Sequence, residues 1–308
     1  MPEKIPVIFG PTASGKSQLA IDLAKRHGGE IISADSRQIY KGMDIGTGKL
    51  LPGERQGIIH HLIDIINPDR IFSAAEFVFE SGHIIKGILK RGRLPVIAGG
   101  TGFYIKALID GFTEIPHGNS EIRANLRKEI KTEGKEKQYE YLCSIDPKSG
   151  VDIHPNNIQR IIRAIEVFET TGIPFSDFKN IPRIKPLSEY KFILFFINVH
   201  REKLYNDINN RVDEMERNGL FKEAAGLAEK WGTNSPGLKT IGYREIADLY
   251  LSGKKTHEQT IDLIKRNTRK YAKRQVTWMR HAFENKGTAI DSSASQREKF
   301  ALVKRCIS

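Results

Sequence analysis

Cysteine and long apolar runs are both scarce in this sequence, and each scarcity excludes a class of protein. Only Cys143 and Cys306 occur. They lie far apart and form no C-x-x-C pair, so we expect reduced thiols and neither a disulfide nor a zinc site. No run of about 18 apolar residues is present, so no membrane-spanning helix is expected. An apolar run begins within the first few residues, which leaves no room for a signal peptide and favours a cytoplasmic protein.

Positive charge is in excess and is concentrated in one late segment. The 308 residues carry a formal net charge of +12, which suits a polyanionic partner such as nucleic acid. Between Lys254 and Arg280 there are nine lysines or arginines against two acidic residues. This concentration favours a nucleic-acid-binding face over a basic charge that is spread evenly.

Residues 10–17 match the phosphate-loop pattern G-x-x-x-x-G-K-[ST]. They are Gly10, Pro11, Thr12, Ala13, Ser14, Gly15, Lys16 and Ser17. An apolar run precedes them and a helix-forming run follows, as this motif requires. Backbone N–H groups and the helix N-terminus would surround the phosphates, with Lys16 on the terminal phosphate and Ser17 on Mg²⁺. The alternative is a glycine-rich turn that binds nothing, and the motif leaves open whether the phosphate is donated, hydrolysed or expelled.

Alternation of apolar runs and helical patterns indicates the fold class. The apolar runs that predict parallel strands are 5–9, 30–33, 60–65, 94–98 and 192–199. Helical patterns lie between them, for example at 73–90. We therefore predict an α/β fold with a doubly wound parallel sheet, like that of P-loop NTPases, and with ligands at the carboxyl ends of the strands.

The alternation stops for a stretch of Pro- and Gly-punctuated helical patterns, which predicts a small helical insertion domain. The predicted boundaries give a core in two parts, 1–112 and 187–308, around an insertion at 113–186. After residue 199 we expect a mostly helical chain, and roughly the last 20 residues are expected to fray.

Three polar residues lie at or just after the ends of predicted strands, and Asp35 and Thr101 each have two interpretations. Asp35 could act as a general base or orient a substrate amine, or it could cap a helix. Thr101, in a Gly-Gly-Thr-Gly run, could contact a ligand that approaches the glycines, or cap a tight turn. Asp64, near the end of the strand predicted at 60–65, resembles the acidic strand end that holds Mg²⁺ through water in many phosphate-loop enzymes.

Basic residues on two predicted helices are candidates for phosphate binding. Arg211 lies beside the apolar stripe of its helix, so it could clamp a diphosphate or instead pair with Asp207 one turn away. Further along, basic residues interleave with Tyr271 and Trp278. That pattern suits a phosphate backbone with unstacked bases, although a tryptophan in such a helix is more often a core residue.

Taken in order along the chain, several segments are long enough to be diagnostic together. They are Gly10–Ser17, Asp35–Thr47, His60–Asp64, Gly99–Tyr104, Asn157–Arg163, Arg211–Met215, Lys239–Glu245 and Tyr271–Arg280. In these segments the chain resembles the tRNA dimethylallyltransferase family in its bacterial form, the isopentenyl transferases that modify the adenosine beside the anticodon. The chain ends without a Cys₂His₂ set, so no zinc is expected.

The resemblance implies transfer of a dimethylallyl group from dimethylallyl diphosphate to the N6 amine of adenosine 37 in tRNA. The phosphate loop would hold the diphosphate, and Lys16, Arg211 and Ser17-bound Mg²⁺ would stabilise it as it leaves. Asp35 would deprotonate the amine, and Thr101 would add a hydrogen bond. The target base would have to leave its stack.

The same resemblance implies contacts with the anticodon stem-loop, by the insertion among other parts. We expect the chain to act as a monomer. The implied contact residues are Asp35, Ser36, Arg37, Gln38, Thr101, Arg123, Gln159, Arg160, Ile161, Ile162, Arg163, Lys239, Thr240, Ile241, Gly242, Tyr243, Arg244, Lys273, Arg274, Gln275, Trp278 and Arg280.

Three other functions use some of the same residues. A small-molecule kinase would use the loop for ATP but leaves the arginine-rich helix unexplained. An adenylate isopentenyltransferase would use the loop and Asp35 but has less need of an insertion and a long basic segment. An RNA-binding protein that merely retains the loop would not need Asp35, Thr101 and Arg211 grouped around it.

Overall fold

The computed structural model describes residues 3–115, 118–283 and 286–307. The strands are β1 (Lys4–Phe9), β2 (Glu30–Ser33), β3 (His60–His61), β4 (Pro95–Gly99), β5 (Lys191–Asn198) and β6 (Gly287–Asp291). The helices are α1 (Lys16–His27), α2 (Ala74–Lys90), α3 (Gly102–Asp110), α4 (Ser120–Glu133), α5 (Lys135–Ile145), α6 (Pro147–Asp152), α7 (Ile158–Thr171), α8 (Arg201–Arg217), α9 (Leu220–Trp231), α10 (Tyr243–Glu245), α11 (His257–Ala282) and α12 (Gln296–Ile307). Short helical turns are η1 (Pro52–Arg55), η2 (Phe175–Asn180), η3 (Gly237–Lys239) and η4 (Ile246–Tyr250).

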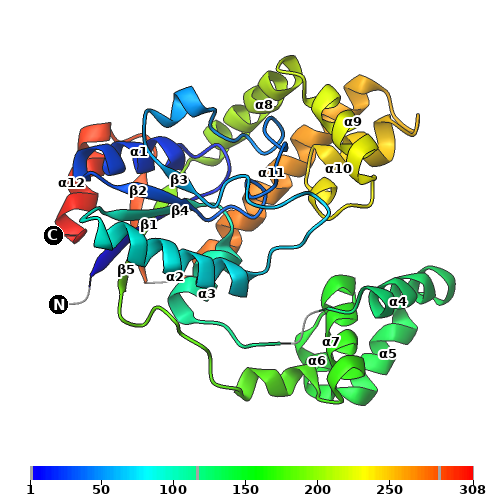
Figure 1. The fold of residues 1–308 in the computed structure, drawn as a ribbon. Coiled ribbons are helices and arrows are strands. Elements are labelled where there is room, and N and C mark those ends of the chain that lie inside the picture. Colours follow the sequence, from blue (N-terminus) through cyan, green and yellow to red (C-terminus); the bar gives the residue numbers. More distant parts are fainter. Residues whose placement is uncertain (1–2, 116–117, 284–285, 308) are drawn as a thin grey trace. The chain divides into compact units, whose positions relative to one another are not determined.

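The strands form one parallel sheet in the order β3-β2-β4-β1-β5-β6. Figure 1 shows α1 and α12 on one side of the sheet and α2 and α3 on the other, so the predicted doubly wound α/β fold is confirmed. The central strand β1 is an almost continuous apolar run and is buried, as a strand covered on both faces must be. Its carboxyl end leads directly into the phosphate loop.

The helix predicted at 73–90 is α2, and its start is fixed by a capping box. The Ser73 hydroxyl accepts a hydrogen bond from the Glu76 N–H at 3.1 Å, and the Glu76 carboxylate accepts one from the Ser73 N–H at 2.7 Å. No helix in the described part of the chain is long and apolar enough to cross a membrane.

The prediction of a strand over 60–65 is wrong in its length, because β3 ends at His61. Leu62 and Asp64 take left-handed φ angles of 60° and 57°, which a strand cannot accommodate. The backbone N–H of Asp64 bonds to the Gln38 carbonyl at 3.1 Å, and that of Ile65 bonds to the Ile39 carbonyl at 2.8 Å. The chain therefore turns to pack on the segment that follows β2.

The chain after residue 199 is mostly helical, as predicted, but the expected fraying of roughly the last 20 residues is wrong, and one strand was missed. Strand β6 pairs with β5, with Ile290 almost fully buried. Helix α12 follows and buries Val303 in a cluster that includes α1 residues. Strand β6 was missed because it is short, begins with glycine and carries a single large apolar side chain, which is too little for a sequence pattern.

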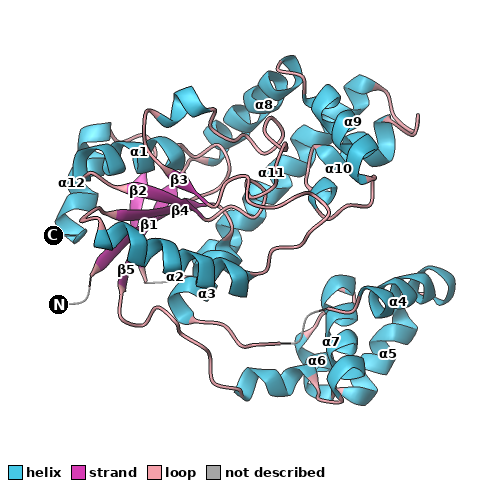
Figure 2. Cartoon of the chain, in the orientation of Figure 1, coloured by secondary structure: helices cyan, strands magenta, loops and turns pink. Residues whose placement is uncertain are grey.

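The chain divides into two compact units, residues 1–109 with 186–308 and residues 110–185. The second unit overlaps the insertion predicted at 113–186 and carries α4 to α7, helical in Figure 2. Its own core contains Leu126, Leu142, Ile161, Ile162 and Ile165. It can therefore be described as a separately packed helical unit.

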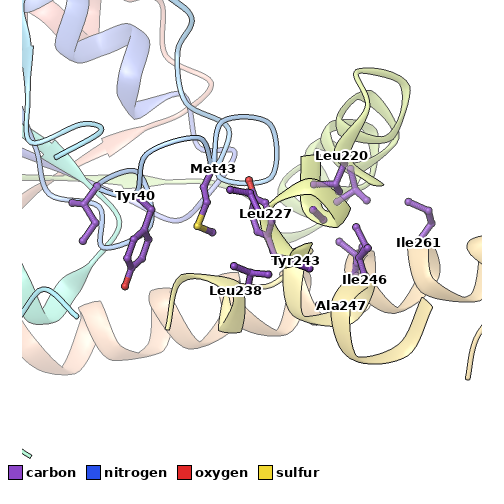
Figure 3. Close-up of a cluster of buried hydrophobic side chains, with 14 of the residues drawn as sticks. Tyr40, Met43, Leu220, Leu227, Leu238, Tyr243, Ile246, Ala247 and Ile261 are labelled. Carbon is purple, nitrogen blue, oxygen red and sulfur yellow. The ribbon is translucent and has the colours of Figure 1, made fainter. Parts of the chain in front are cut away.

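In the first unit, a second core joins the segment after β2 to the C-terminal helices. Tyr40 and Met43 pack in one cluster with Leu220, Leu238 and Tyr243 (Figure 3). The loop from residue 40 onward thus rests on α9, η3 and α10. This packing positions one wall of the candidate site described next.

Candidate functional site

The phosphate loop joins β1 to α1 with the backbone that its glycines allow. Gly15 has a left-handed φ of 81° and stands at the N-cap of α1, where no described side chain caps the helix. At Gly10 a Cβ atom would lie 2.7 Å from the Ser14 hydroxyl, so a side chain there would collide with the loop. The N–H groups at the start of α1 are left for another acceptor, as at anion sites on helix N-termini.

Lys16 and Arg211 bring two cations into the recess at this loop. The Lys16 ammonium donates to the Pro11 carbonyl at 3.1 Å. Burial lowers the pKa of Lys16 to about 8; the Asp35 charge opposes this shift and the Arg211 charge adds to it. Desolvation likewise lowers the pKa of Arg211, again opposed by Asp35. Two desolvated cations close together favour the binding of an anion.

Arg211 reaches this recess from the packed helix α8. Its Nη2 donates to the Gly48 carbonyl at 3.1 Å. The alternative partner, Asp207, is instead paired with Lys203 at 2.6 Å. Arg211 therefore does not depend on the Asp207 pair, and its role as a diphosphate clamp stays a prediction.

Three adjoining cavities of the first unit share Lys16 and Arg211 in their walls. One, of about 300 Å³, is also lined by Asp35, Thr47, residues 239–242 and Tyr271. A second, of about 830 Å³, is lined by residues 13–18 of the phosphate loop and by residues 44–45 and 48–51. A third, of about 50 Å³, lies between Ser17, Asp35 and Arg211. The two cations therefore stand where a phosphate-loop cavity meets a second, separate cavity.

Asp35 begins a turn and does not cap a helix. Its Oδ1 accepts a hydrogen bond from the Arg37 N–H at 2.9 Å, an Asx-turn. Thr101 fixes the same turn, because its hydroxyl accepts from the Ser36 N–H at 2.9 Å and lies 3.2 Å from the Ser36 hydroxyl. Asp35 lines two of the cavities, whereas the Thr101 hydroxyl contacts Ser36 of this turn.

The glycines beside Thr101 make room for the protein's own packing. At Gly99 a Cβ atom would lie 2.1 Å from the Ala34 carbonyl oxygen, and at Gly102 it would lie 2.1 Å from the Trp278 ring. Trp278 also meets Phe283 edge to face, with ring centroids 5.9 Å apart. Tight packing therefore explains these glycines, Trp278 serves partly as a packing residue, and a ligand contact by Thr101 stays a prediction.

Of the other expected RNA contacts in the first unit, some are exposed and some are not. Lys273, Arg274 and Arg280 are exposed on α11, and the segment from Lys239 to Gly242 lines the cavity of 300 Å³. Gln275 is buried and bridges two loops: its Oε1 accepts from the Thr12 N–H at 3.2 Å and its Nε2 donates to the Gly100 carbonyl at 2.8 Å.

The expected contact of the Tyr243 side chain with RNA is wrong, because this side chain is fully buried in the core of Figure 3. Its hydroxyl accepts from the Gly46 N–H at 3.0 Å and donates to Glu223. Arg244, next in the chain, pairs with Glu245 at 2.7 Å. Of Tyr243 and Arg244, only Arg244 is exposed at the surface.

In the second unit, the expected RNA contacts of the Ile161 and Ile162 side chains are likewise wrong, since these residues are 1% and 2% exposed and belong to its core. Gln159 and Arg160 are exposed neighbours on the other side of α7. Two further expected contacts, Arg123 and Arg163, pair with the buried carboxylate of Glu166 at 2.6 and 2.8 Å. The motif thus mixes core, ion-paired and exposed side chains.

Sequence reasoning missed Gly46 and Thr47, which line the cavity that contains Asp35. Both stand at the end of the diagnostic segment 35–47, so the signal was present but was assigned no role. Glu223, which contacts this loop, was missed altogether because a glutamate in an amphipathic helix carries no distinctive pattern.

Within the described residues, no group of three or more His, Cys, Asp or Glu side chains could hold a metal ion. Asp64 is paired with the buried Lys49, which also binds Asp44 at 2.7 Å, so its place in a metal shell stays a prediction. Ser17 lines both the phosphate-loop cavity and the smallest cavity. It is therefore the hydroxyl that a phosphate-bound cation could reach.

Comparisons with known proteins agree on one family. A family model described as IPP transferase matches residues 38–282. A tRNA dimethylallyltransferase of Thermoanaerobacter sp. (strain X514) is 47% identical over 281 residues, 90% of this chain and 89% of that protein. The tRNA isopentenylpyrophosphate transferase of Bacillus halodurans has a similar structure, with a TM-score of 0.72 and 38% identity over 100% of this chain and 96% of that one.

A eukaryotic dimethylallyltransferase, described as acting on tRNA, is also similar. The TM-score is 0.79 and the identity 27%, over 99% of this chain and 78% of that chain. With matches that span nearly its whole length, the chain belongs to the IPP transferase family.

Proposed function

We propose that this protein transfers a dimethylallyl group from dimethylallyl diphosphate to the N6 amine of adenosine 37, 3′ to the anticodon, in tRNA. The observation that carries the proposal is that Asp35, Lys16 and Arg211 line one cavity, which adjoins the phosphate-loop cavity. A diphosphate leaving group and an amine acceptor can thus meet at the same three side chains. The names of the relatives support the same activity.

In this proposal the phosphate loop binds the diphosphate of the donor. The N–H groups at the start of α1, together with Lys16 and Arg211, surround its oxygens. As the bond between the allylic carbon and the diphosphate oxygen breaks, negative charge grows on the leaving group. Two cations that the protein already holds in place stabilise that charge without reorganising.

Asp35 acts on the acceptor. The flipped adenine enters the cavity of 300 Å³, and its N6 nitrogen attacks the allylic carbon as the diphosphate leaves. The nitrogen loses a proton, and the Asp35 carboxylate takes it. The hydrogen bonds from the Ser36 N–H to the Thr101 hydroxyl and from the Arg37 N–H to Asp35 keep that carboxylate in place. The products are N6-(dimethylallyl)adenosine and diphosphate.

Mg²⁺ fits this site as an ion held mainly by the diphosphate and water. Ser17 lines two of the cavities, and Mg²⁺ commonly binds substrate phosphates with only one or two protein ligands. When bound, it would add positive charge to the leaving diphosphate. The enzyme is accordingly proposed to be Mg-dependent.

The exposed cations of α11, Lys273, Arg274 and Arg280, form the proposed contact with the RNA backbone. Arg274 also lines the acceptor cavity, so this contact leads to the target base. Gln159 and Arg160 of the helical insertion are proposed to touch the anticodon loop. We propose that one chain acts as a monomer.

The test is a product assay with competing acceptors. The protein is incubated with Mg²⁺, dimethylallyl diphosphate and an anticodon stem-loop whose loop adenosine follows an adenosine, with AMP and ATP in parallel reactions. Mass spectrometry is expected to find one dimethylallyl group on the RNA, none on AMP, and none when EDTA replaces Mg²⁺. Modified AMP would indicate an adenylate isopentenyltransferase, and phosphate transfer from ATP would indicate a kinase.

A further inference from the structure

The loop from Asp44 to Gly48 separates the cavities and receives Arg211. Gly46 and Thr47 line the cavity with Asp35, and Asp44, Ile45 and Gly48 line the phosphate-loop cavity. The Gly48 carbonyl accepts from Arg211 Nη2 at 3.1 Å. At Gly48, with a φ of 58°, a Cβ atom would lie 1.6 Å from that nitrogen. The direction of the guanidinium therefore depends on where this loop lies.

Glu223 of α9 binds the backbone of this loop. Its carboxylate accepts hydrogen bonds from three consecutive backbone N–H groups, those of Asp44 at 3.1 Å, Ile45 at 2.9 Å and Gly46 at 3.2 Å. Consecutive N–H groups that converge in this way normally form a site for an anion. Here the anion is a side chain of the protein itself.

Tyr243 completes the arrangement. Its hydroxyl donates to Glu223 and accepts from the Gly46 N–H at 3.0 Å, while its ring is fully buried among Met43, Leu220 and Leu238. Figure 3 shows these side chains between the loop and the C-terminal helices. Glu223 is thus supported by a packed core and binds residues 44–46, while Arg211 binds the Gly48 carbonyl of the same loop.

We propose that Glu223 is a positioning residue for the transfer reaction. By fixing the N–H groups of residues 44–46, it sets the Gly48 carbonyl that aims Arg211 at the diphosphate. Glu223 itself touches neither substrate. Glutamine cannot replace it, because a carboxamide has one acceptor oxygen and would present its NH₂ to N–H groups. This inference rests on the proposed function, since it assigns Arg211 to the diphosphate.

The first test measures diphosphate binding, which needs neither RNA nor prenyl transfer. Calorimetry with inorganic diphosphate is run on the wild type, Glu223→Gln, Arg211→Gln and the double variant. We expect Glu223→Gln alone to weaken binding about tenfold, because a small misplacement of a binding group is costly. In the Arg211→Gln background it should cost less than about twofold, since the two residues act through one path.

The matched control is Glu229→Gln, the same change at an exposed position of the same helix. It should leave diphosphate binding unchanged. Tyr243→Phe, which keeps the buried ring and removes the hydroxyl, should reproduce part of the Glu223→Gln loss. Circular dichroism melting identifies any variant that has failed to fold, and Tyr243→Phe then carries the test alone.

The second test separates kcat from KM in the transfer assay. Glu223→Gln should lower kcat about 10- to 100-fold and leave KM for the stem-loop RNA within about threefold, because the loop's effect passes to Arg211. Losses that multiply in the double variant, or a loss confined to RNA binding, would overturn the proposal. If the wild type prenylates no RNA, the proposed function fails, whereas the diphosphate measurement still decides the role of Glu223.

Discussion

Two groups of cations in this chain differ in what balances their charge. In the first unit, Lys16 and Arg211 stand in a recess where desolvation lowers both pKa values, and Asp35 opposes the shift from a distance. In the second unit, Arg123 and Arg163 contact the buried carboxylate of Glu166 directly. The first group is kept at an energetic cost and gains from an added anion. The second is already neutralised in part and serves the fold of its unit.

This difference separates binding charge from structural charge better than the motifs do. When burial beside another cation lowers the pKa of a cation, a negative ligand bound there is stabilised. Removal of a buried carboxylate that pairs with two arginines instead destabilises the fold. The predictions below test whether each group behaves as its surroundings indicate.

The largest effect is expected at Asp35, the negative member of the first group. Asp35→Asn keeps the size of the side chain and the acceptor of the Asx-turn but removes the base. Its kcat for RNA prenylation should fall about 10³-fold, the scale of general-base catalysis. The melting temperature should stay close to that of the wild type. A kcat within about tenfold of the wild type would show that another group accepts the proton.

The next effect is expected at Glu166, and it concerns stability instead of catalysis. Glu166→Ala leaves Arg123 and Arg163 without their buried partner, which should cost the second unit about 3 kcal/mol. Hydrogen exchange of the α7 amides measures this loss directly. Glu169→Ala, an exposed position on the same helix, is the control and should change exchange little. Unchanged α7 protection in Glu166→Ala would mean that the ion pairs are not structural.

The same contrast shows how far the sequence could predict the site. At the carboxyl ends of the strands, topology decides which side chains converge, so Lys16 and Asp35 could be placed together from the order of the elements. Arg211 instead became a candidate because it lies beside the apolar stripe of its helix. On α7 the direction of each side chain changes by about 100° per residue. Consecutive motif residues therefore diverge, and Ile161 and Ile162 became core while Arg160 stayed exposed.

Features that depend on distant backbone groups could not be predicted from the sequence, for a different reason. The end of β3 depends on left-handed φ angles at Leu62 and Asp64, and nothing in an apolar run signals a residue forced into that region. Strand β6 forms because β5 offers it an edge. Glu223 acquires its role from N–H groups about 180 residues earlier in the chain. These are consequences of tertiary packing that local patterns do not contain.

The smallest effect is expected from pH, and it tests the first cation group directly. With a pKa of about 8, Lys16 is charged below pH 8 in the free enzyme and loses its charge above it. A bound diphosphate raises that pKa, so binding takes up a proton above pH 8. The affinity should then fall by up to tenfold per pH unit, about 1.4 kcal/mol. Calorimetry between pH 7 and 9.5 measures this slope.

Lys16→Arg supplies the reference for that measurement, because arginine stays charged throughout the range. The ligand's own titration affects both proteins equally, so the ratio of their affinities isolates Lys16. The ratio should be constant below pH 8 and should change above it, with the wild type losing affinity relative to the variant. A ratio that is constant up to pH 9.5 would mean that Lys16 keeps an ordinary pKa. The recess would then be hydrated in solution, and the contrast with the ion-paired arginines of the second unit would be lost.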